Sequence, residues 1–154
     1  GWDATVLDFS QVGLDRAQQL AGSRLTPAQQ ARFHTLRADA ASDSVSPKTF
    51  DLVIVAYLQL AADERRSAMR TAASAVREDG YLFVIAHDSA NLLAGYGGPQ
   101  DPTVLYTAAD LADDVSDSGL HVIRADAVKR TVDVQGVDRT AIDALLIARR
   151  PPVV

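Results

Sequence analysis

Residues 2–10 read Trp-Asp-Ala-Thr-Val-Leu-Asp-Phe-Ser, and this stretch decides the fold. Residues 4–7 are a short apolar run typical of a strand, which ends on Asp8 and continues through Phe9 and Ser10 into a helical pattern. Open α/β sheets bind ligands at the carboxyl ends of their strands, where a carboxylate commonly accepts hydrogen bonds from a nucleoside ribose. The stretch therefore predicts a nucleotide-type site at Asp8.

Strand-like and helix-like patterns alternate along the rest of the sequence. The apolar runs expected to form further strands are residues 33–38, 52–57, 81–86, 121–130 and 141–148. The helices are expected over residues 10–22, with Ser10 and Gly22 as caps, over 63–77, and from Thr107 to about residue 118. This alternation predicts a doubly wound α/β sheet. Only a turn at 135–139 separates the last two strands, so they are expected to pair antiparallel.

Composition narrows the class of protein. The 154 residues are 47% hydrophobic and 23% charged, which is ordinary for a globular domain. The net charge is −5 and the basic residues are scattered, so a nucleic-acid partner is not expected. There is no cysteine, which suits a cytoplasmic protein. No apolar run has the length of a membrane span, and no His, Asp and Glu spacing suggests a metal site.

Three segments carry a resemblance to a known family: Val6-Leu7-Asp8-Phe9-Ser10, Ala38-Asp39-Ala40 and Phe50-Asp51-Leu52-Val53. With the turn at residues 79–80 and the terminal hairpin, they resemble class I S-adenosylmethionine-dependent methyltransferases, especially the small bacterial and actinobacterial members. The resemblance covers essentially the whole sequence. It implies a Rossmann-like doubly wound α/β sheet with a C-terminal antiparallel hairpin, forming one methyltransferase-like domain over residues 1–154.

The resemblance also implies a site for the cofactor S-adenosyl-L-methionine. Asp8 would accept from the ribose hydroxyls with Phe9 against the adenine, and Asp39 would accept from the adenine amine with the Ala40 amide nearby. The segment Ala56-Tyr57-Leu58, at the end of the strand expected over residues 52–57, would line the methionine arm. The residues assigned to this site are Asp8, Phe9, Asp39, Ala40, Ala56 and Tyr57. The alternative for Asp8 and Asp39 is an ordinary role in a helix cap or a turn.

The family's first strand and its glycine-rich loop have no counterpart in these 154 residues, so the fold is expected to be N-terminally truncated, without the first β-α unit. The strands at 4–7 and 52–57 would then each have an unpaired edge. They are expected to pair with each other or with a second chain, giving a homodimer or a strand-swapped assembly. The expectation for this form is adenosine-end contacts at best and no methyl transfer.

His87, at the end of the strand 81–86, is the candidate catalytic residue. An imidazole with a pKa of about 6.5 can take a proton from a hydroxyl or an amine at neutral pH. The glycine-rich loop over residues 89–106 follows it and has the length of a binding segment. The residues assigned to the acceptor are Asp88, Asn91, Tyr96 and Tyr106. For Asp88 and Asn91 the alternative is a role as turn formers.

The expected activity is O- or N-methylation of a small-molecule acceptor. Residues 56–59 read Ala-Tyr-Leu-Gln, without the Asn-Pro-Pro-Tyr type of sequence that accompanies methylation of base amino groups. Two alternatives stay open: a catalytically inactive methyltransferase-like fold, and a different dinucleotide-binding Rossmann enzyme.

Overall fold

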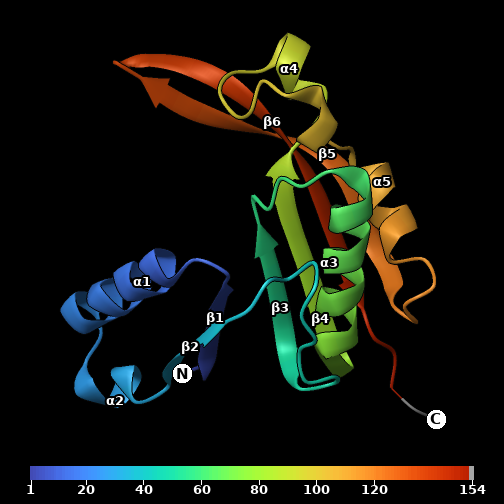
Figure 1. Cartoon of the computed structure of the whole chain (residues 1–154). Helices are drawn as coiled ribbons and strands as arrows, with labels where there is room; N and C mark the ends of the chain where they lie inside the picture. The colour runs from blue at the N-terminus through green and yellow to red at the C-terminus, as the bar shows by residue number, and fades with distance from the viewer. Residues whose placement is uncertain (153–154) are drawn as a thin grey trace. The chain divides into compact units, whose positions relative to one another are not determined.

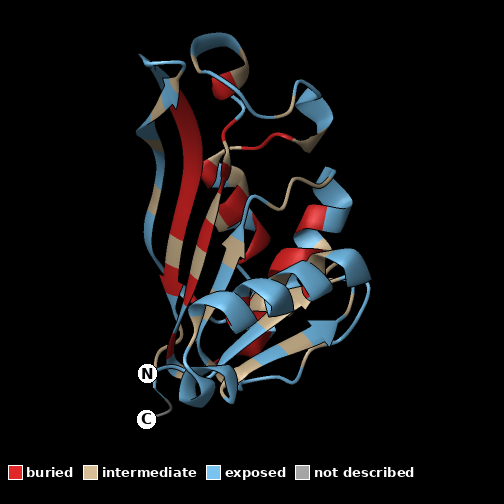
Figure 2. Cartoon of the chain, turned by 90° about the vertical axis from the view of Figure 1, so that its left-hand side faces the viewer, coloured by how far each residue is buried: buried red, intermediate tan, exposed pale blue. Residues whose placement is uncertain are grey.

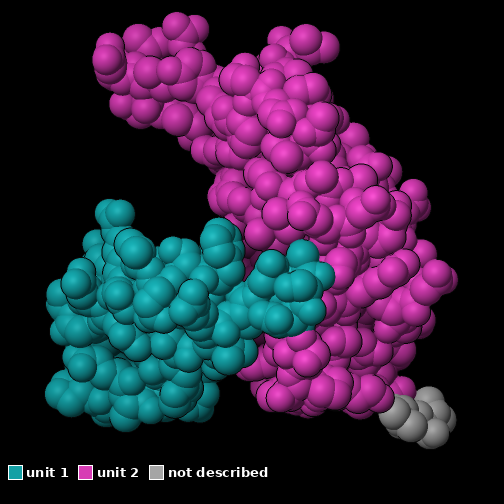
Figure 3. Space-filling model, viewed as in Figure 1, with its two compact units in different colours: residues 1–43 teal, residues 44–154 magenta. Residues whose placement is uncertain are grey.

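The computed structural model describes residues 1–152. These residues divide between two compact units, with the boundary between Asp43 and Ser44 (Figure 3). The strands are divided between two sheets in the same way. The α/β class predicted from the sequence is confirmed. The assignment of one domain to residues 1–154 stays a prediction, and each unit is described by itself below.

Unit 1 contains a two-stranded parallel sheet and two helices. Its elements are β1 (Ala4–Asp8), α1 (Gln11–Arg24), α2 (Pro27–Gln30) and β2 (Phe33–Arg37). The predicted N-cap is confirmed, because the Ser10 side chain accepts from the Gly13 amide. The predicted C-cap at Gly22 is wrong, because α1 continues to Arg24. The helix stops at Leu25, whose backbone is extended, and Thr26 stays extended before Pro27, as the residue before a proline usually does.

Unit 2 contains a four-stranded mixed sheet. Its elements are β3 (Phe50–Ala56), α3 (Ala62–Ala75), β4 (Val76–His87), α4 (Asn91–Ala94), the 3-10 helix η1 (Pro102–Val104), α5 (Ala108–Asp114), β5 (His121–Val134) and β6 (Val137–Arg149). The strand order is β3-β4-β6-β5; β3 and β4 are parallel, and the other two pairs are antiparallel. The predicted antiparallel hairpin at one side of the sheet is therefore confirmed (Figure 1).

The core of unit 2 lies between its sheet and the helices α3 and α5 (Figure 2). In β4, Leu82, Val84 and Ala86 are fully buried, whereas the alternate positions are only half-buried. Period-two alternation places the half-buried residues, including His87, on the opposite face of the sheet. A buried ion pair joins the two helices, since Arg65 Nε lies 2.6 Å from Asp114 Oδ2.

Three boundaries in unit 2 differ from the sequence prediction. β4 begins at Val76, directly after α3, because the 79–80 turn is absorbed as an irregularity in the pairing with β3, where Asp79 has a φ of 63°. α5 ends at Asp114 rather than near residue 118. The hairpin strands are longer than expected because Gln135 and Gly136, with φ of 55° and 81°, make a tight two-residue turn.

Both strands expected to have an open edge do have one. Within residues 1–152, β1 pairs only with β2, and β3 pairs only with β4. β1 and β3 belong to separate sheets, one in each unit, and their pairing with each other or with a second chain stays a prediction. Each leaves one row of backbone donors and acceptors without a strand partner.

Candidate functional site

In unit 1 the predicted cofactor residues gather at the carboxyl edge of the β1–β2 sheet. Asp8 ends β1 opposite Arg37 of β2, and the Ala38 amide donates to the Asp8 carbonyl at 3.2 Å. Asp39 follows one residue later. Because the strands are parallel, Asp8 and Asp39 leave the sheet at the same edge, as the sequence predicted.

The Asp8 carboxylate is half-buried and placed at the start of α1. Its Oδ1 accepts from the Ser10 amide at 2.8 Å, so Asp8 does form the turn that the alternative assigned to it. A Cβ atom on Gly13 would lie 2.7 Å from Asp8 Oδ2, so glycine at this position is what lets the first turn of α1 approach the carboxylate. A carboxylate oxygen has about two acceptor sites, so both oxygens can still receive a ribose hydroxyl. Asp8 thus fits a nucleoside while serving the turn.

Two neighbours of Asp8 fit an adenine ring to different degrees. Phe9 is 71% exposed and presents an aromatic surface suitable for stacking. The Asp39 carboxylate accepts from the Ala41 amide at 2.9 Å, and the Asp39 amide donates to Asp43, so Asp39 also organises its own loop. Ala40 lies within that loop and is half-buried.

In unit 2 four polar side chains meet on the sheet face opposite α3 and α5. Tyr57 follows β3, His87 ends β4, Asp143 lies on β6 and Arg130 on β5. His87 and Asp143 are directly paired across β4 and β6. The rings of Tyr57 and His87 are 4.9 Å apart between centroids, and the Arg130 guanidinium lies 5.7 Å from the centre of the Tyr57 ring. We call these four residues the His87 cluster.

Asp143 is the centre of the His87 cluster. Its side chain is 1% exposed, and its Oδ2 accepts from Arg130 Nε at 2.6 Å and from the Tyr57 hydroxyl at 3.2 Å. The hydrogen bond from Arg130 to Asp143 raises the pKa of the guanidinium. Burial and then the charge of Asp143 raise the pKa of Tyr57, so the phenol stays neutral. Tyr57 also has a φ of 54°, a strained value for a bulky residue that often accompanies a functional position.

The loop after β4 is anchored next to the His87 cluster. The Asn91 side chain donates to the Gly97 carbonyl at 2.7 Å and accepts from the Ile142 amide at 2.7 Å. Asp88 accepts from the Ala90 amide at 2.8 Å. Both side chains are almost fully buried, so they hold the loop in place. Their assignment to the acceptor stays a prediction.

The two tyrosines expected beside the loop have different surroundings. Tyr96 is 43% exposed on the loop itself. Tyr106 is 2% exposed; its hydroxyl donates to the Leu58 carbonyl at 2.6 Å, and the Arg65 guanidinium lies 5.0 Å from the ring centre. Tyr106 therefore supports the segment after β3 from inside the core. Ala56, the last residue of β3, is exposed.

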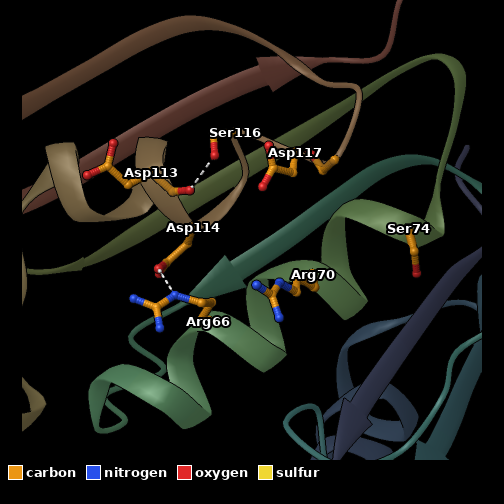
Figure 4. Close-up of a pocket in the computed structure, with 8 residues that line it drawn as sticks. Arg66, Arg70, Ser74, Asp113, Asp114, Ser116 and Asp117 are labelled. Carbon is orange, nitrogen blue, oxygen red and sulfur yellow. Dashed lines mark hydrogen bonds and ion pairs between the residues drawn. The ribbon is translucent and has the colours of Figure 1, made fainter.

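A separate cavity of about 370 Å³ lies between α3 and the turn after α5 (Figure 4). Arg66 and Arg70 face Asp113 and Asp117 across it, and Arg66 Nε lies 3.6 Å from Asp114 Oδ1. It contains none of the predicted site residues. Among residues 1–152, no group of His, Asp and Glu side chains has an arrangement that would hold a metal ion, and no helix is long and apolar enough to cross a membrane.

Two residues of the His87 cluster, Asp143 and Arg130, were not predicted from the sequence. Asp143 had a visible signal, because it is a single carboxylate inside the apolar run 141–148. A charged residue in a buried strand needs a partner and is therefore worth singling out. Arg130 had no such signal, because its partnership with Asp143 depends on the register of the hairpin.

Comparison with solved structures finds close similarity in fold. A SAM-dependent methyltransferase from Methanosarcina mazei is 12% identical, with a TM-score of 0.69, over 97% of this chain and 82% of that one. The N-methyltransferase NodS from Bradyrhizobium japonicum WM9 is 18% identical, with a TM-score of 0.65, over 96% of this chain and 72% of that one. The [4+2]-cyclase SpnF is 16% identical, with a TM-score of 0.67, over 97% of this chain and 66% of that one.

Comparisons by sequence find no match: no protein-family model and no curated protein matches this chain. At identities this low, the structural similarity shows the fold alone. The choice of reaction and substrate must come from the side chains.

Proposed function

From the premise that the chain has the fold of class I S-adenosylmethionine-dependent methyltransferases, we propose that the protein methylates an oxygen or nitrogen atom of a small molecule in the cytoplasm, and that these 154 residues bind S-adenosyl-L-methionine through its adenosine end. The observation that carries the proposal is Asp8, a half-buried carboxylate at the carboxyl end of a parallel strand in this fold, with an exposed Phe9 beside it.

The residues of unit 1 would hold the adenosine end of the cofactor. Asp8 offers two oxygens to the ribose hydroxyls, with charge-assisted bonds. Phe9 offers a stacking surface, and the Asp39–Ala40 loop offers polar groups to the adenine edge. The bound cofactor supplies an activated methyl group on a sulfonium, so the protein must mainly align the partners and accept a proton.

The His87 cluster supplies the proton acceptor. His87 is the imidazole at the carboxyl end of β4, and its side chain is 15% exposed. The resemblance assigns Ala56 and Tyr57 to the methionine arm. Ala56 ends β3, the strand beside β4, and Tyr57 follows it. The loop over residues 89–106, with the exposed Tyr96, would contact the acceptor.

Isothermal calorimetry with S-adenosyl-L-methionine tests the proposal. Asp8→Asn keeps an oxygen that can accept from the Ser10 amide, so the turn is preserved, but it removes the charge. We expect it to weaken binding by about 1.5–3 kcal/mol, or roughly ten- to a hundredfold. Asp3→Asn, on an exposed position before β1, is the control and should bind as the unaltered chain does.

The alternatives make different predictions in the same experiment. A different dinucleotide enzyme would bind NAD in preference to S-adenosyl-L-methionine. An inactive fold that serves only for interaction with another protein would bind neither. Equal affinity of the Asp8→Asn variant and the unaltered chain would rule out the assignment of Asp8.

A further inference from the structure

Asp143 lies at a position where burying a carboxylate is energetically unfavourable. Apart from Asp143, all residues from Ala141 to Leu146 are apolar and buried. Asp143 itself is 1% exposed. A buried carboxylate is tolerated only where donors surround it. Its position is fixed by the pairing of β4 with β6, which sets it directly opposite His87.

One oxygen of Asp143 is fully engaged and the other is not. Oδ2 receives hydrogen bonds from Arg130 Nε and the Tyr57 hydroxyl, at 2.6 and 3.2 Å. Oδ1 lies 3.4 Å from His87 Nδ1. In the described residues, Oδ1 and Nδ1 are the two buried side-chain polar atoms that have no hydrogen-bond partner. Each is thus the natural partner of the other, and a shift of a few tenths of an ångström would bring them to hydrogen-bond distance.

We propose, resting on the methyltransferase function above, that Asp143 is a positioning residue that holds the neutral His87 ring with its hydrogen on Nδ1. Nε2 is then the acceptor of a proton from the substrate. Arg130 and Tyr57 are positioning residues in turn, because they fix Oδ2 and so direct Oδ1 toward the ring. The acceptor class that needs this device is a hydroxyl or amine that still carries its proton when it binds.

The proton and the electrons balance in this arrangement. The acceptor's O–H or N–H proton passes to His87 Nε2, and the electron pair left on the acceptor atom forms the bond to the methyl carbon. The bond from that carbon to sulfur breaks, and its electron pair stays on sulfur. The resulting imidazolium is stabilised by Asp143 and returns the extra proton to water.

The neighbourhood of the ring supports a single orientation. A Cβ atom on Gly98 would lie 2.9 Å from both Cγ and Nδ1 of His87, so the loop backbone packs directly against the imidazole. The Tyr57 ring also contacts the imidazole, with 4.9 Å between the ring centroids and an angle of 44° between the ring planes. The His87 amide also donates to Gln59 Oε1 at 2.8 Å, which fixes the backbone from which the ring extends.

Long-range 1H–15N correlation NMR of the histidine rings tests the proposal without substrate or cofactor. The chain has three histidines, so the exposed His34 and His121 serve as internal references, and His87→Gln assigns the signals. We expect His87 at neutral pH to show a protonated Nδ1 and an unprotonated Nε2. Because no ligand is needed, this result is independent of whether calorimetry supports cofactor binding.

Asp143→Asn gives a sharper test, because it should reverse the tautomer. Arg130 can only donate, so the amide oxygen of Asn must face it. The NH2 group then faces His87 Nδ1, which must become the acceptor, and the hydrogen moves to Nε2. Asp138→Asn, at an exposed position on the same strand, is the matched control and should leave the His87 signals unchanged.

The outcomes separate clearly. A protonated Nδ1 in the unaltered chain and a reversed tautomer in Asp143→Asn support the proposal. It is overturned if the unaltered chain carries the hydrogen on Nε2 or on both nitrogens, or shows the averaged pattern of an exposed histidine. An unchanged tautomer in a folded Asp143→Asn variant also overturns it. If that variant does not fold, the spectrum of the unaltered chain decides.

Discussion

Gly98 allows the loop after β4 to pack against the His87 ring. Its φ is 81°, and an added Cβ would lie 2.9 Å from the imidazole. Gly97, with a φ of 75°, has no atom within 4 Å of such a Cβ and is a matched control. Both alanine variants should lose about 1–2 kcal/mol from the left-handed backbone. Gly98→Ala should lose about 1–3 kcal/mol more from the ring contact.

Urea unfolding of the two glycine variants measures the difference. A larger loss of unfolding free energy in Gly98→Ala than in Gly97→Ala confirms that the loop backbone lies on the His87 ring. Equal losses in the two variants would contradict that packing.

Tyr106 gives a pH-dependent prediction. Burial raises its pKa from 10.0 to about 12. Because the folded state favours the neutral phenol, its contribution to stability is complete below the unfolded pKa of about 10 and is lost as the pH rises toward about 12. Tyr106→Phe should lose about 1 kcal/mol at neutral pH with the bond to the Leu58 carbonyl, and should lack this alkaline decline.

Unfolding free energies measured from neutral pH to about pH 12 test the role of Tyr106. Tyr96→Phe, at an exposed position, should retain the decline of the unaltered chain. An equally steep decline in Tyr106→Phe would mean that another group is responsible.

The sequence predicts single residues well where local chemistry decides their role. Asp8, Ser10 and Thr107 are examples: the structure places Asp8 at a strand end, confirms Ser10 as an N-cap, and starts α5 at the predicted Thr107, which caps it. Prediction from the sequence fails where the role of a residue depends on pairing with a strand far away in the chain. Asp143 becomes the partner of His87 only through the register of β4 with β6, and that register cannot be obtained from either strand alone.

Among the elements, β3 has the most consequential exposed edge. Within residues 1–152 it pairs only with β4, and the side chain of Ile54 is 60% exposed. Exposed apolar edge strands favour pairing with another chain. We propose that the chain self-associates through β3, as a homodimer or a strand-swapped assembly. Ile54→Lys places a charge on this edge strand and should shift the assembly toward monomer.

Light scattering over a range of concentrations measures the self-association. Leu93→Lys is the control, because Leu93 is 93% exposed but lies on the helix α4 and not on a strand. It should leave the apparent mass unchanged. A monomer at all concentrations for the unaltered chain would contradict association through β3.

For helices and strands, the sequence predicts the type of each element better than the residues at which it begins and ends. All six strands were expected, because apolar runs with turn residues between them are a strong signal. The start of β4 was missed, since the β3 pairs on either side of the turn residues 78–80, Phe50 with Val76 and Leu52 with Tyr81, keep the turn within the strand as an irregularity. The bond from the Asp79 amide to the Arg150 carbonyl also holds them there. Tertiary hydrogen bonds overrode local turn chemistry.

In the whole molecule, the two units differ in the size of their cores. Of the buried apolar side chains in residues 1–152, only Leu14 and Ala21 belong to unit 1. Two-stranded sheets with little buried surface are marginally stable. Hydrogen-exchange mass spectrometry should therefore show faster exchange in β1 and β2 than in β4 and β6. Equal protection of the four strands would contradict this ranking.

The α/β class and the terminal hairpin follow from the order of patterns in the sequence, because few topologies accommodate that order. The division into two units does not follow from it. It depends on which strands find partners, and β1 and β3 each have one open edge.

The central claim is that this chain uses Asp8 and its neighbours to bind S-adenosyl-L-methionine. The most direct measurement is a 1H–15N NMR titration of the unaltered chain and of Asp8→Asn with that cofactor. We predict saturable shifts of the amides of residues 8–10 and 38–41 in the unaltered chain, and a roughly ten- to a hundredfold weaker response in the variant. Saturation without shifts in these two segments, or an identical response from Asp8→Asn, would contradict the claim.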